Sequence, residues 1–466
     1  MLKIIFLFLM AGGLPVAIAM AGASLLYVAW SGNLPPFVVV HRMIGGIDSF
    51  PLLAVPFFIL AGNLMNNAGI TNRIYNFALA LVGWLKGGLG HVNVIGSVIF
   101  AGMSGTAIAD AAGLGTIEIK AMKDHGYATE FAVGVTAASA TLGPIIPPSL
   151  PFVIYAMMAN VSVGALFLAG LLPGVLMALL MMATVAYFAH KNGWGGDIKF
   201  DLSRLVKALI ELAVVAAWPL AVYYGAAWSG QPQLVAVLGL ALLFAGDRYF
   251  KWQAVLPIMT PVLLIGGMTT GLFTPTEGAI AASVWAMVLG LFWYRTLNWK
   301  MFVKISLDTV EMTATVMFVV AAASIFGWML TATGVTAALA QWVLAFTKEP
   351  WVFLLLANLL MLFVGCFLEP TAAITILVPL LLPIAAQLGV DPVHFGLVMV
   401  LNLMIGLLHP PMGMVLFVLA RVARLSVERT TMAIVPWLLP LLASLALLTY
   451  VPSISLWLPR LAGLAR

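Results

Sequence analysis

The stretch Gly102-Met103-Ser104-Gly105-Thr106 lies in the middle of an apolar segment that runs from residue 93 to residue 125. As one continuous helix this segment would be about 50 Å long, whereas the hydrocarbon core of a bilayer is roughly 30 Å thick. Glycine beside hydroxyl residues is a place where a helix is easily interrupted. We therefore expect residues 93–125 to form a re-entrant helical hairpin with its tip at this stretch.

The same pattern occurs again in the second half of the chain. The apolar segment 351–387 is also too long for one crossing, and Glu369-Pro370-Thr371 lies at its middle. Each hairpin is followed by a second apolar stretch, 127–160 or 391–420, that contains a pair of prolines. Because adjacent prolines cannot continue an intact helix, these stretches predict two discontinuous helices. Their breaks read Gly143-Pro144-Ile145-Ile146-Pro147-Pro148-Ser149 and Gly406-Leu407-Leu408-His409-Pro410-Pro411-Met412-Gly413.

Matching residues at these interruptions indicate an internal duplication. Five residues each have an identical residue 263 positions later; the pairs are Gly102 and Gly365, Gly126 and Gly389, Gly143 and Gly406, Pro147 and Pro410, and Pro148 and Pro411. We predict a first repeat over residues 1–190, a linker with an extra hydrophobic hairpin over 191–250, and a second repeat over 251–466.

The composition places the chain in a membrane. Of its 466 residues, 63% are hydrophobic and 8% are charged, too apolar for a soluble fold. We expect residues 2–30 to be a retained helix rather than a cleaved signal peptide. Basic residues are scattered between apolar spans, which argues against nucleic-acid binding and predicts that the loop 191–207 is cytoplasmic and the N-terminus outside. The single Cys366 excludes an intramolecular disulfide and cysteine-based metal clusters.

Broken helices at membrane depth are typical of transporters, which bind substrate and coupling ions there. We predict that the hairpin tips and the facing breaks form this site, without a catalytic residue or an organic cofactor. The candidate residues of the first half are Ser104, Gly105, Thr106, Thr141, Gly143, Pro147 and Pro148, with Asp110 in a supporting role. Those of the second half are Glu369, Pro370, Thr371, Asn402, Gly406, Pro410 and Pro411. Na⁺ is expected at Ser104, Thr106, Gly143, Thr371 and Gly406.

Two further motifs complete a family resemblance: Phe273-Thr274-Pro275-Thr276-Glu277 and Asp391-Pro392-Val393-His394-Phe395-Gly396. With the first tip and the first break, they resemble the large, DctM-like membrane subunit of TRAP transporters. The resemblance implies an all-α polytopic membrane protein with inverted repeats, built as an elevator with a scaffold and a transport domain. It implies Na⁺-coupled uptake of a C4-dicarboxylate, keto acid or sugar acid across the bacterial inner membrane. A small four-helix membrane subunit and a periplasmic substrate-binding protein would be its partners.

Other functions fit the residues less well. A stand-alone divalent-anion:Na⁺ symporter shares hairpins and broken helices and remains the main alternative. A channel gives no reason for matched breaks in two halves. An intramembrane enzyme needs a nucleophile with a base or paired catalytic carboxylates, and the sequence shows no such pattern.

Overall fold

The computed structural model describes residues 1–32, 34–229, 231–252, 254–269, 272–410 and 413–464. Within these residues the regular structure is helical, and the β pairing consists of an isolated bridge between Lys86 and Gly196. The all-α prediction is confirmed. Six helices of the described part are long and apolar enough to cross a membrane: Val163–Lys191, Leu202–Val222, Pro275–Trp293, Trp299–Ala332, Pro370–Gln387 and Val427–Tyr450.

The described part of the chain begins with five α-helices and one 3₁₀ turn. They are α1 (Leu2–Ala11), α2 (Val16–Ser31), α3 (Phe37–Ile47), the 3₁₀ turn η1 (Phe50–Leu53), α4 (Ala54–Asn67) and α5 (Ile70–Val82). The expected single helix over 2–30 is wrong, because the chain turns between α1 and α2. Gly13, with a φ of 80°, and Pro15 lie at that turn, and both oppose a continuous helix.

The first hairpin and the first broken helix follow at the predicted places. The hairpin comprises α6 (Gly88–Ser104), α7 (Ala107–Ala112) and α8 (Leu114–Asp124), and the broken helix comprises α9 (Thr129–Ala140) and α10 (Leu150–Ala159). The hairpin reverses at Gly105, whose φ of 63° suits glycine. The gap from Thr141 to Ser149 contains three prolines, Pro144, Pro147 and Pro148, which cannot donate the backbone hydrogen bonds of a continuous helix.

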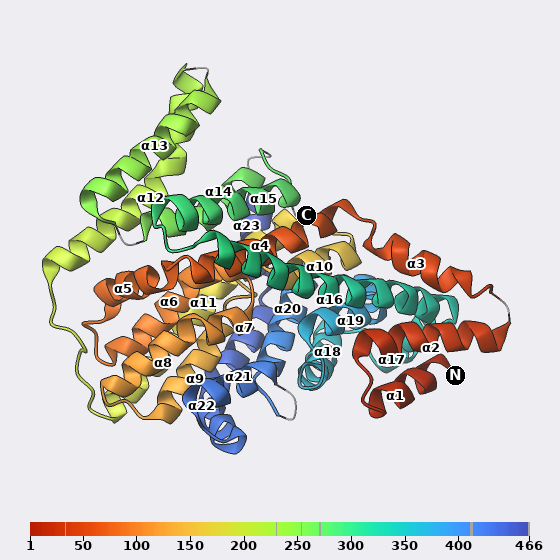
Figure 1. Cartoon of the computed structure of the whole chain (residues 1–466). Coiled ribbons are helices and arrows are strands. Elements are labelled where there is room, and N and C mark those ends of the chain that lie inside the picture. The colour runs from red at the N-terminus through yellow and green to blue at the C-terminus, as the bar shows by residue number, and fades with distance from the viewer. Residues whose placement is uncertain (33, 230, 253, 270–271, 411–412, 465–466) are drawn as a thin grey trace.

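The connecting region is helical. It contains α11 (Val163–Lys191), α12 (Leu202–Ser229), α13 (Pro232–Phe250), α14 (Val255–Thr269), α15 (Pro275–Met287), the π-helical η2 (Val288–Trp293), α16 (Trp299–Ala332) and α17 (Val335–Phe346). In Figure 1, α12 and α13 project away from the remaining helices. The division of the chain at residues 190 and 250 stays a prediction, as does the inversion of the repeats.

The second half repeats the order of hairpin and broken helix. Its elements are α18 (Pro350–Gly365), α19 (Pro370–Gln387), α20 (Pro392–Gly406), α21 (Met414–Ala423), α22 (Val427–Tyr450) and α23 (Pro452–Leu461). Glu369 caps the start of α19, and Asp391 accepts hydrogen bonds from the first amides of α20. Proline at the first position of both helices costs no helical hydrogen bond, because the first amide of a helix has no partner within the helix.

The two halves interlock around a shared apolar core. Helix α10 of the first half packs against α19 and α20 of the second, and α7 packs against α21. Tyr155 illustrates the fit, because its ring lies against Gly396 and its hydroxyl donates to the Pro392 carbonyl at 2.7 Å. Helix α4 contributes Val55 and Phe58 to this core and packs along α15 and α16, and α16 also contacts α2, α3 and α19. The first hairpin is therefore held between α4, which packs on α6, and α21 of the second half, which packs on α7.

Candidate functional site

A cavity of about 330 Å³ lies between the two hairpin tips. Its wall includes Ser104 and Thr106 from the first tip and Glu369, Pro370 and Thr371 from the second. Helices α4, α7, α10, α16, α20 and α21 contribute the remaining wall together with Pro144 and Leu407. The structure thus brings together predicted residues that are more than 260 positions apart in the sequence.

The first tip is packed tightly against the first break. A Cβ on Gly105 would lie 2.6 Å from the Pro148 carbonyl oxygen, and one on Gly143 would lie 3.0 Å from that of Thr106. Thr106 caps α7, because its hydroxyl accepts from the Ala109 amide at 3.3 Å. The buried Ser104 hydroxyl has no hydrogen-bond partner among the described residues. A buried, unpaired oxygen beside the cavity is suited to an ion.

The side chains of the first break serve the backbone. Thr141 donates to the Ala138 carbonyl at 2.6 Å, which satisfies its hydroxyl within α9. Ser149 donates to the Pro144 carbonyl at 2.5 Å and accepts from the Phe152 amide at 3.3 Å. Thr141, Gly143, Pro147 and Pro148 are buried behind the tip rather than in the wall of the main cavity. Their part in ion binding stays a prediction.

The second tip presents a carboxylate. Glu369 lines the cavity and is exposed, and its oxygens accept from the Thr371 hydroxyl at 2.8 Å and the Ala372 amide at 3.2 Å. These bonds fix the carboxylate at the first turn of α19, where a negative charge is favoured by the helix dipole. Among the described residues that line this cavity, it is the one charged side chain.

The second break differs from the first in what its residues contact. A Cβ on Gly406 would lie 2.6 Å from the Gly365 backbone, so the break touches the arm of its hairpin. Asn402 is buried and donates to the Asn358 side chain at 2.8 Å, away from the cavity wall. Pro410 is exposed, whereas Pro411 lies outside the described residues. The cavity wall here is formed by Met404, Leu407 and Met414.

Asp110 lies behind the first tip. It is buried, and its Oδ2 has no hydrogen-bond partner among the described residues. Nearby, Glu118 accepts from the Asn93 amide at 2.7 Å, and Asn93 also donates to Thr136 at 2.8 Å. The Ser139 hydroxyl donates to the side-chain oxygen Oδ1 of Asn93 at 2.7 Å. These bonds join α6, α8 and α9 under the tip, and Asp110 shares this buried region rather than the cavity wall.

Helices α4 and α16 also line the cavity, which we did not predict from the sequence. Asn63 and Asn66 of α4 and Met312 of α16 line the cavity. Asn63 donates to the Thr309 hydroxyl at 3.1 Å, and a Cβ on Gly113 would lie 2.6 Å from Asn66 Oδ1. Side chains three positions apart lie on one helix face, so the asparagine pair in an otherwise apolar stretch could have predicted that this face of α4 lines a polar site.

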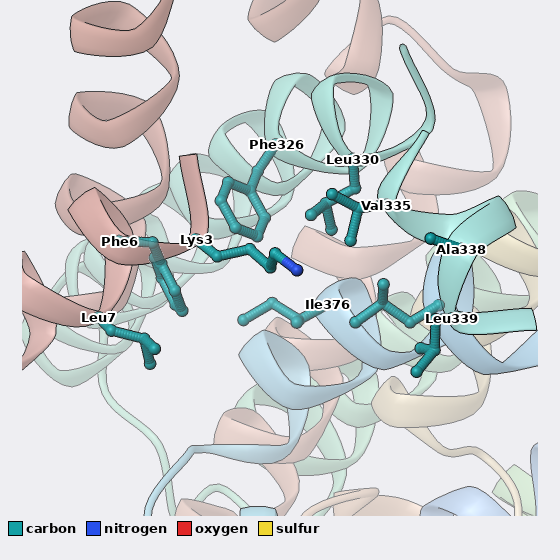
Figure 2. A pocket seen from close by; sticks show the side chains of 10 residues that line it. Lys3, Phe6, Leu7, Phe326, Leu330, Val335, Ala338, Leu339 and Ile376 are labelled. Atoms are coloured by element: carbon teal, nitrogen blue, oxygen red, sulfur yellow. The ribbon is translucent and has the colours of Figure 1, made fainter. Parts of the chain in front are cut away.

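A larger cavity near the N-terminus has a different character. It measures about 460 Å³ and lies between α1, α16, α17 and α19, as Figure 2 shows. Apart from Lys3 its labelled wall residues are apolar, including Phe326, Leu330 and Ile376. A wall of this kind offers few groups that could hold a polar substrate, so the cavity between the tips is the better candidate.

Helix ends give the central cavity its electrostatic character. Helices α10, α19 and α21 begin at its wall, with Leu150, Pro370 and Met414 as their first residues. The helix dipoles place partial positive charge at these N-termini and favour an anion, and at α19 the Glu369 carboxylate already accepts from the Ala372 amide. At the end of α20 the carbonyls of Leu403, Ile405 and Gly406 accept from the amides that follow. Helix α6 ends at the wall with Ser104, so its last carbonyl oxygens lie close to the cavity. Such oxygens suit a cation.

Comparison with known families identifies the chain. Residues 3–454 match the model of the tripartite ATP-independent periplasmic transporter, DctM component. The chain belongs to this family. A DctM-family chain is a large transport permease of the membrane, and not an enzyme.

Named relatives of this DctM-family chain cover nearly its whole length. It is 41% identical over 453 residues to the sialic acid TRAP transporter large permease protein SiaM of Vibrio cholerae, covering 97% of this chain and 96% of that protein. It is 34% identical to the C4-dicarboxylate TRAP transporter large permease protein DctM of Rhodobacter capsulatus, covering 98% and 97%. The YdaH transporter of Alcanivorax borkumensis has a similar fold, with a TM-score of 0.61, 15% identity, and coverage of 92% and 89%.

Proposed function

We propose that this permease imports a small organic anion together with Na⁺, and that the cavity between the hairpin tips binds both. A small four-helix membrane subunit and a periplasmic binding protein would work with it in the bacterial inner membrane. This arrangement would use a transmembrane Na⁺ gradient rather than ATP. The family match covers nearly the whole chain. It therefore favours a transporter made of three components over a stand-alone divalent-anion:Na⁺ symporter.

The observation that carries the proposal is the convergence of three helix N-termini on one cavity. Helices α10, α19 and α21 each contain at least ten residues and begin at the wall. The described part of the wall contains no Lys or Arg. A carboxylate would therefore be held by backbone amides and by bound Na⁺, and not by a basic side chain.

Na⁺ binding follows from the other helix ends. At the first tip, the free carbonyls at the end of α6, the unpaired Ser104 hydroxyl and Thr106 form one set of oxygens, with Gly143 behind them. At the second tip, Thr371 and the end of α20 at Gly406 form the other, with the Glu369 carboxylate nearby. Each Na⁺ would lower the electrostatic cost of placing an anion beside Glu369.

Transport would proceed by an elevator movement of the hairpins and broken helices against α4 and α16. Small residues support this proposal, because a Cβ on Gly62 of α4 would lie 3.1 Å from the Ser104 carbonyl oxygen. Where glycine meets backbone, no side chains interlock, so two elements can slide along each other. Substrate and Na⁺ would set the direction through their different affinities for the outward and inward positions.

The substrate class is proposed from the relatives and from the cavity. The SiaM relative is named for sialic acid and the DctM relative for C4-dicarboxylates, and both ligands are carboxylates. The two asparagines in the wall add amide groups that suit the hydroxyls of a sugar acid. We therefore propose a sugar acid of the sialic acid type as the first substrate to test.

Uptake into proteoliposomes tests the proposal. Vesicles would hold the permease with its small membrane subunit, and its binding protein would be supplied outside with radiolabelled sialic acid or succinate. We expect accumulation of one of these anions with an inward Na⁺ gradient, and background uptake with K⁺ in place of Na⁺ or without the binding protein. Equal uptake in K⁺ would refute Na⁺ coupling. Full uptake without the binding protein would support the stand-alone symporter.

A further inference from the structure

A basic pocket lies away from the transport site, at the base of the projecting helices α12 and α13. It has a volume of about 820 Å³ and lies between the start of α5, the end of α13 and the residues at the end of η2. Arg73, Arg248 and Lys251 line it together with one carboxylate, Asp247. Two positive charges therefore remain in excess, so the pocket is suited to an anion.

The arginine of α5 is held in a defined position. The Arg73 guanidinium lies 4.0 Å from the centre of the Tyr294 ring, and its Nη1 donates to the Trp252 carbonyl at 3.2 Å. A guanidinium has five N–H donors, so donors remain for a phosphate after this bond. Asp247 is buried and accepts from the Trp293 indole at 2.7 Å, which fixes the carboxylate to the wall.

The surface next to the pocket is apolar and faces outward. Leu238, Leu242 and Tyr249 lie on one face of α13 and are 53%, 72% and 81% exposed. Trp293 and Tyr294 in the pocket are of the residue types that gather at the boundary between headgroups and hydrocarbon. An apolar stripe that ends at a cationic pocket matches a molecule with acyl chains and an anionic headgroup.

We propose that this pocket binds the phosphate headgroup of an anionic phospholipid, with its acyl chains along the Leu238 to Tyr249 face of α13. The lipid would anchor α12 and α13 to α5 at the membrane surface. Arg248 and Lys251 are exposed, so they are free to contact the headgroup, whereas Arg73 is half-buried and defines the inner end of the pocket. This site is independent of the proposed Na⁺-coupled transport.

Native mass spectrometry of the full chain in detergent tests this inference. The probes are phosphatidylglycerol, phosphatidylethanolamine and inorganic phosphate, added to the natural chain and to the double variant Arg248→Ala/Lys251→Ala. The matched control is Lys300→Ala/Lys304→Ala, which removes two exposed lysines at the start of α16 outside the pocket. Thermal unfolding of each protein checks that it remains folded.

We expect the natural chain and the control to retain phosphatidylglycerol in preference to phosphatidylethanolamine. The pocket variant should bind phosphatidylglycerol roughly 30-fold more weakly, since about 1 kcal/mol is lost for each basic residue removed. Equal binding by the two double variants would overturn the proposal. Equal retention of both lipids would also overturn it, and so would binding of inorganic phosphate without binding of phosphatidylglycerol.

Discussion

The two hairpins share a design but differ in how each tip is completed. At the first tip a neutral Thr106 caps the next helix, and the break is buried against the tip backbone. At the second tip the charged Glu369 caps the next helix, and the break contacts the hairpin arm at Gly365 instead. The first tip is therefore packed closely, backbone against backbone, whereas the second tip brings a carboxylate to the cavity.

The buried hydrogen bonds beneath the two tips resemble each other more closely than the tips themselves do. Asn93 on the arm of the first hairpin accepts from Ser139 of α9, and Asn358 on the arm of the second accepts from Asn402 of α20. Asn358 follows Asn93 by 265 positions, and Asn402 follows Ser139 by 263. Both halves thus keep an asparagine that ties the hairpin to its broken helix. The two halves therefore differ mainly in the groups that their tips offer to a ligand.

Adding a methyl group at the tight contacts should have the largest effect. In Gly105→Ala and Gly406→Ala the new Cβ would lie 2.6 Å from backbone atoms. We expect uptake near background and a loss of about 3 kcal/mol in unfolding free energy, because backbone neighbours cannot move aside. Proteoliposome uptake and thermal unfolding would measure both.

The duplication supplies a matched control for these glycines. Gly126 and Gly389 are repeat-related, have φ values of 83° and 76°, and have no heavy atom within 4 Å of an added Cβ. Alanine at either position should cost only about 1 kcal/mol of backbone strain and leave uptake largely intact. If all four variants behaved alike, the close packing at the tips would not explain the loss.

Replacing Asn93 or Asn358 by alanine should show which half loses more unfolding free energy when its buried hydrogen bonds are removed. Asn93→Ala leaves the buried Glu118 carboxylate without its amide donor, and we expect a loss of about 3 kcal/mol in unfolding free energy. Asn358→Ala deprives neutral Asn402 and Thr449 of their partner and should cost about 2 kcal/mol. Denaturant unfolding in detergent compares them. A larger loss for Asn358→Ala would reverse this ranking.

Glu369→Gln tests the chemical difference between the tips. The substitution keeps the size of the cap and removes its charge, so α19 should still begin at Pro370. We expect the Na⁺ concentration for half-maximal uptake to rise about tenfold, as for the loss of one charge-assisted interaction. Thr106→Ala, which removes the neutral cap, provides the comparison. An unchanged Na⁺ dependence in Glu369→Gln would leave Glu369 as a helix cap alone.

The smallest effect is expected at a polar contact found next to the first hairpin. The Tyr127 hydroxyl and the Leu89 amide both donate to Asp197 Oδ2, each at 2.7 Å. Tyr127→Phe removes one of these bonds and should cost about 1 kcal/mol at pH 7. Burial raises the pKa of the Tyr127 hydroxyl, so this stability is fully present below pH of about 10 and is lost only at higher pH. A difference that varied between pH 6 and 9 would contradict it.

The helix breaks could be predicted from the sequence because segment length and local chemistry agree. Residues 93–125 and 351–387 exceed one crossing, and glycine or proline lies where each must turn. The turn between α1 and α2 was missed because apolar length alone does not show where a helix ends. The pairing of the two tips around one cavity requires the packing of α7 on α21 and α10 on α19, which no local pattern encodes.

The central claim is that both tips face one site for Na⁺ and substrate. It is tested most directly by thiol labelling of Thr106→Cys and Thr371→Cys in a Cys366→Ala background, which removes the single native cysteine. We predict that Na⁺ and substrate together slow labelling at both positions, and that K⁺ with substrate does not. Labelling rates at both tips that do not respond to Na⁺ and substrate, in a variant that still transports, would contradict the account.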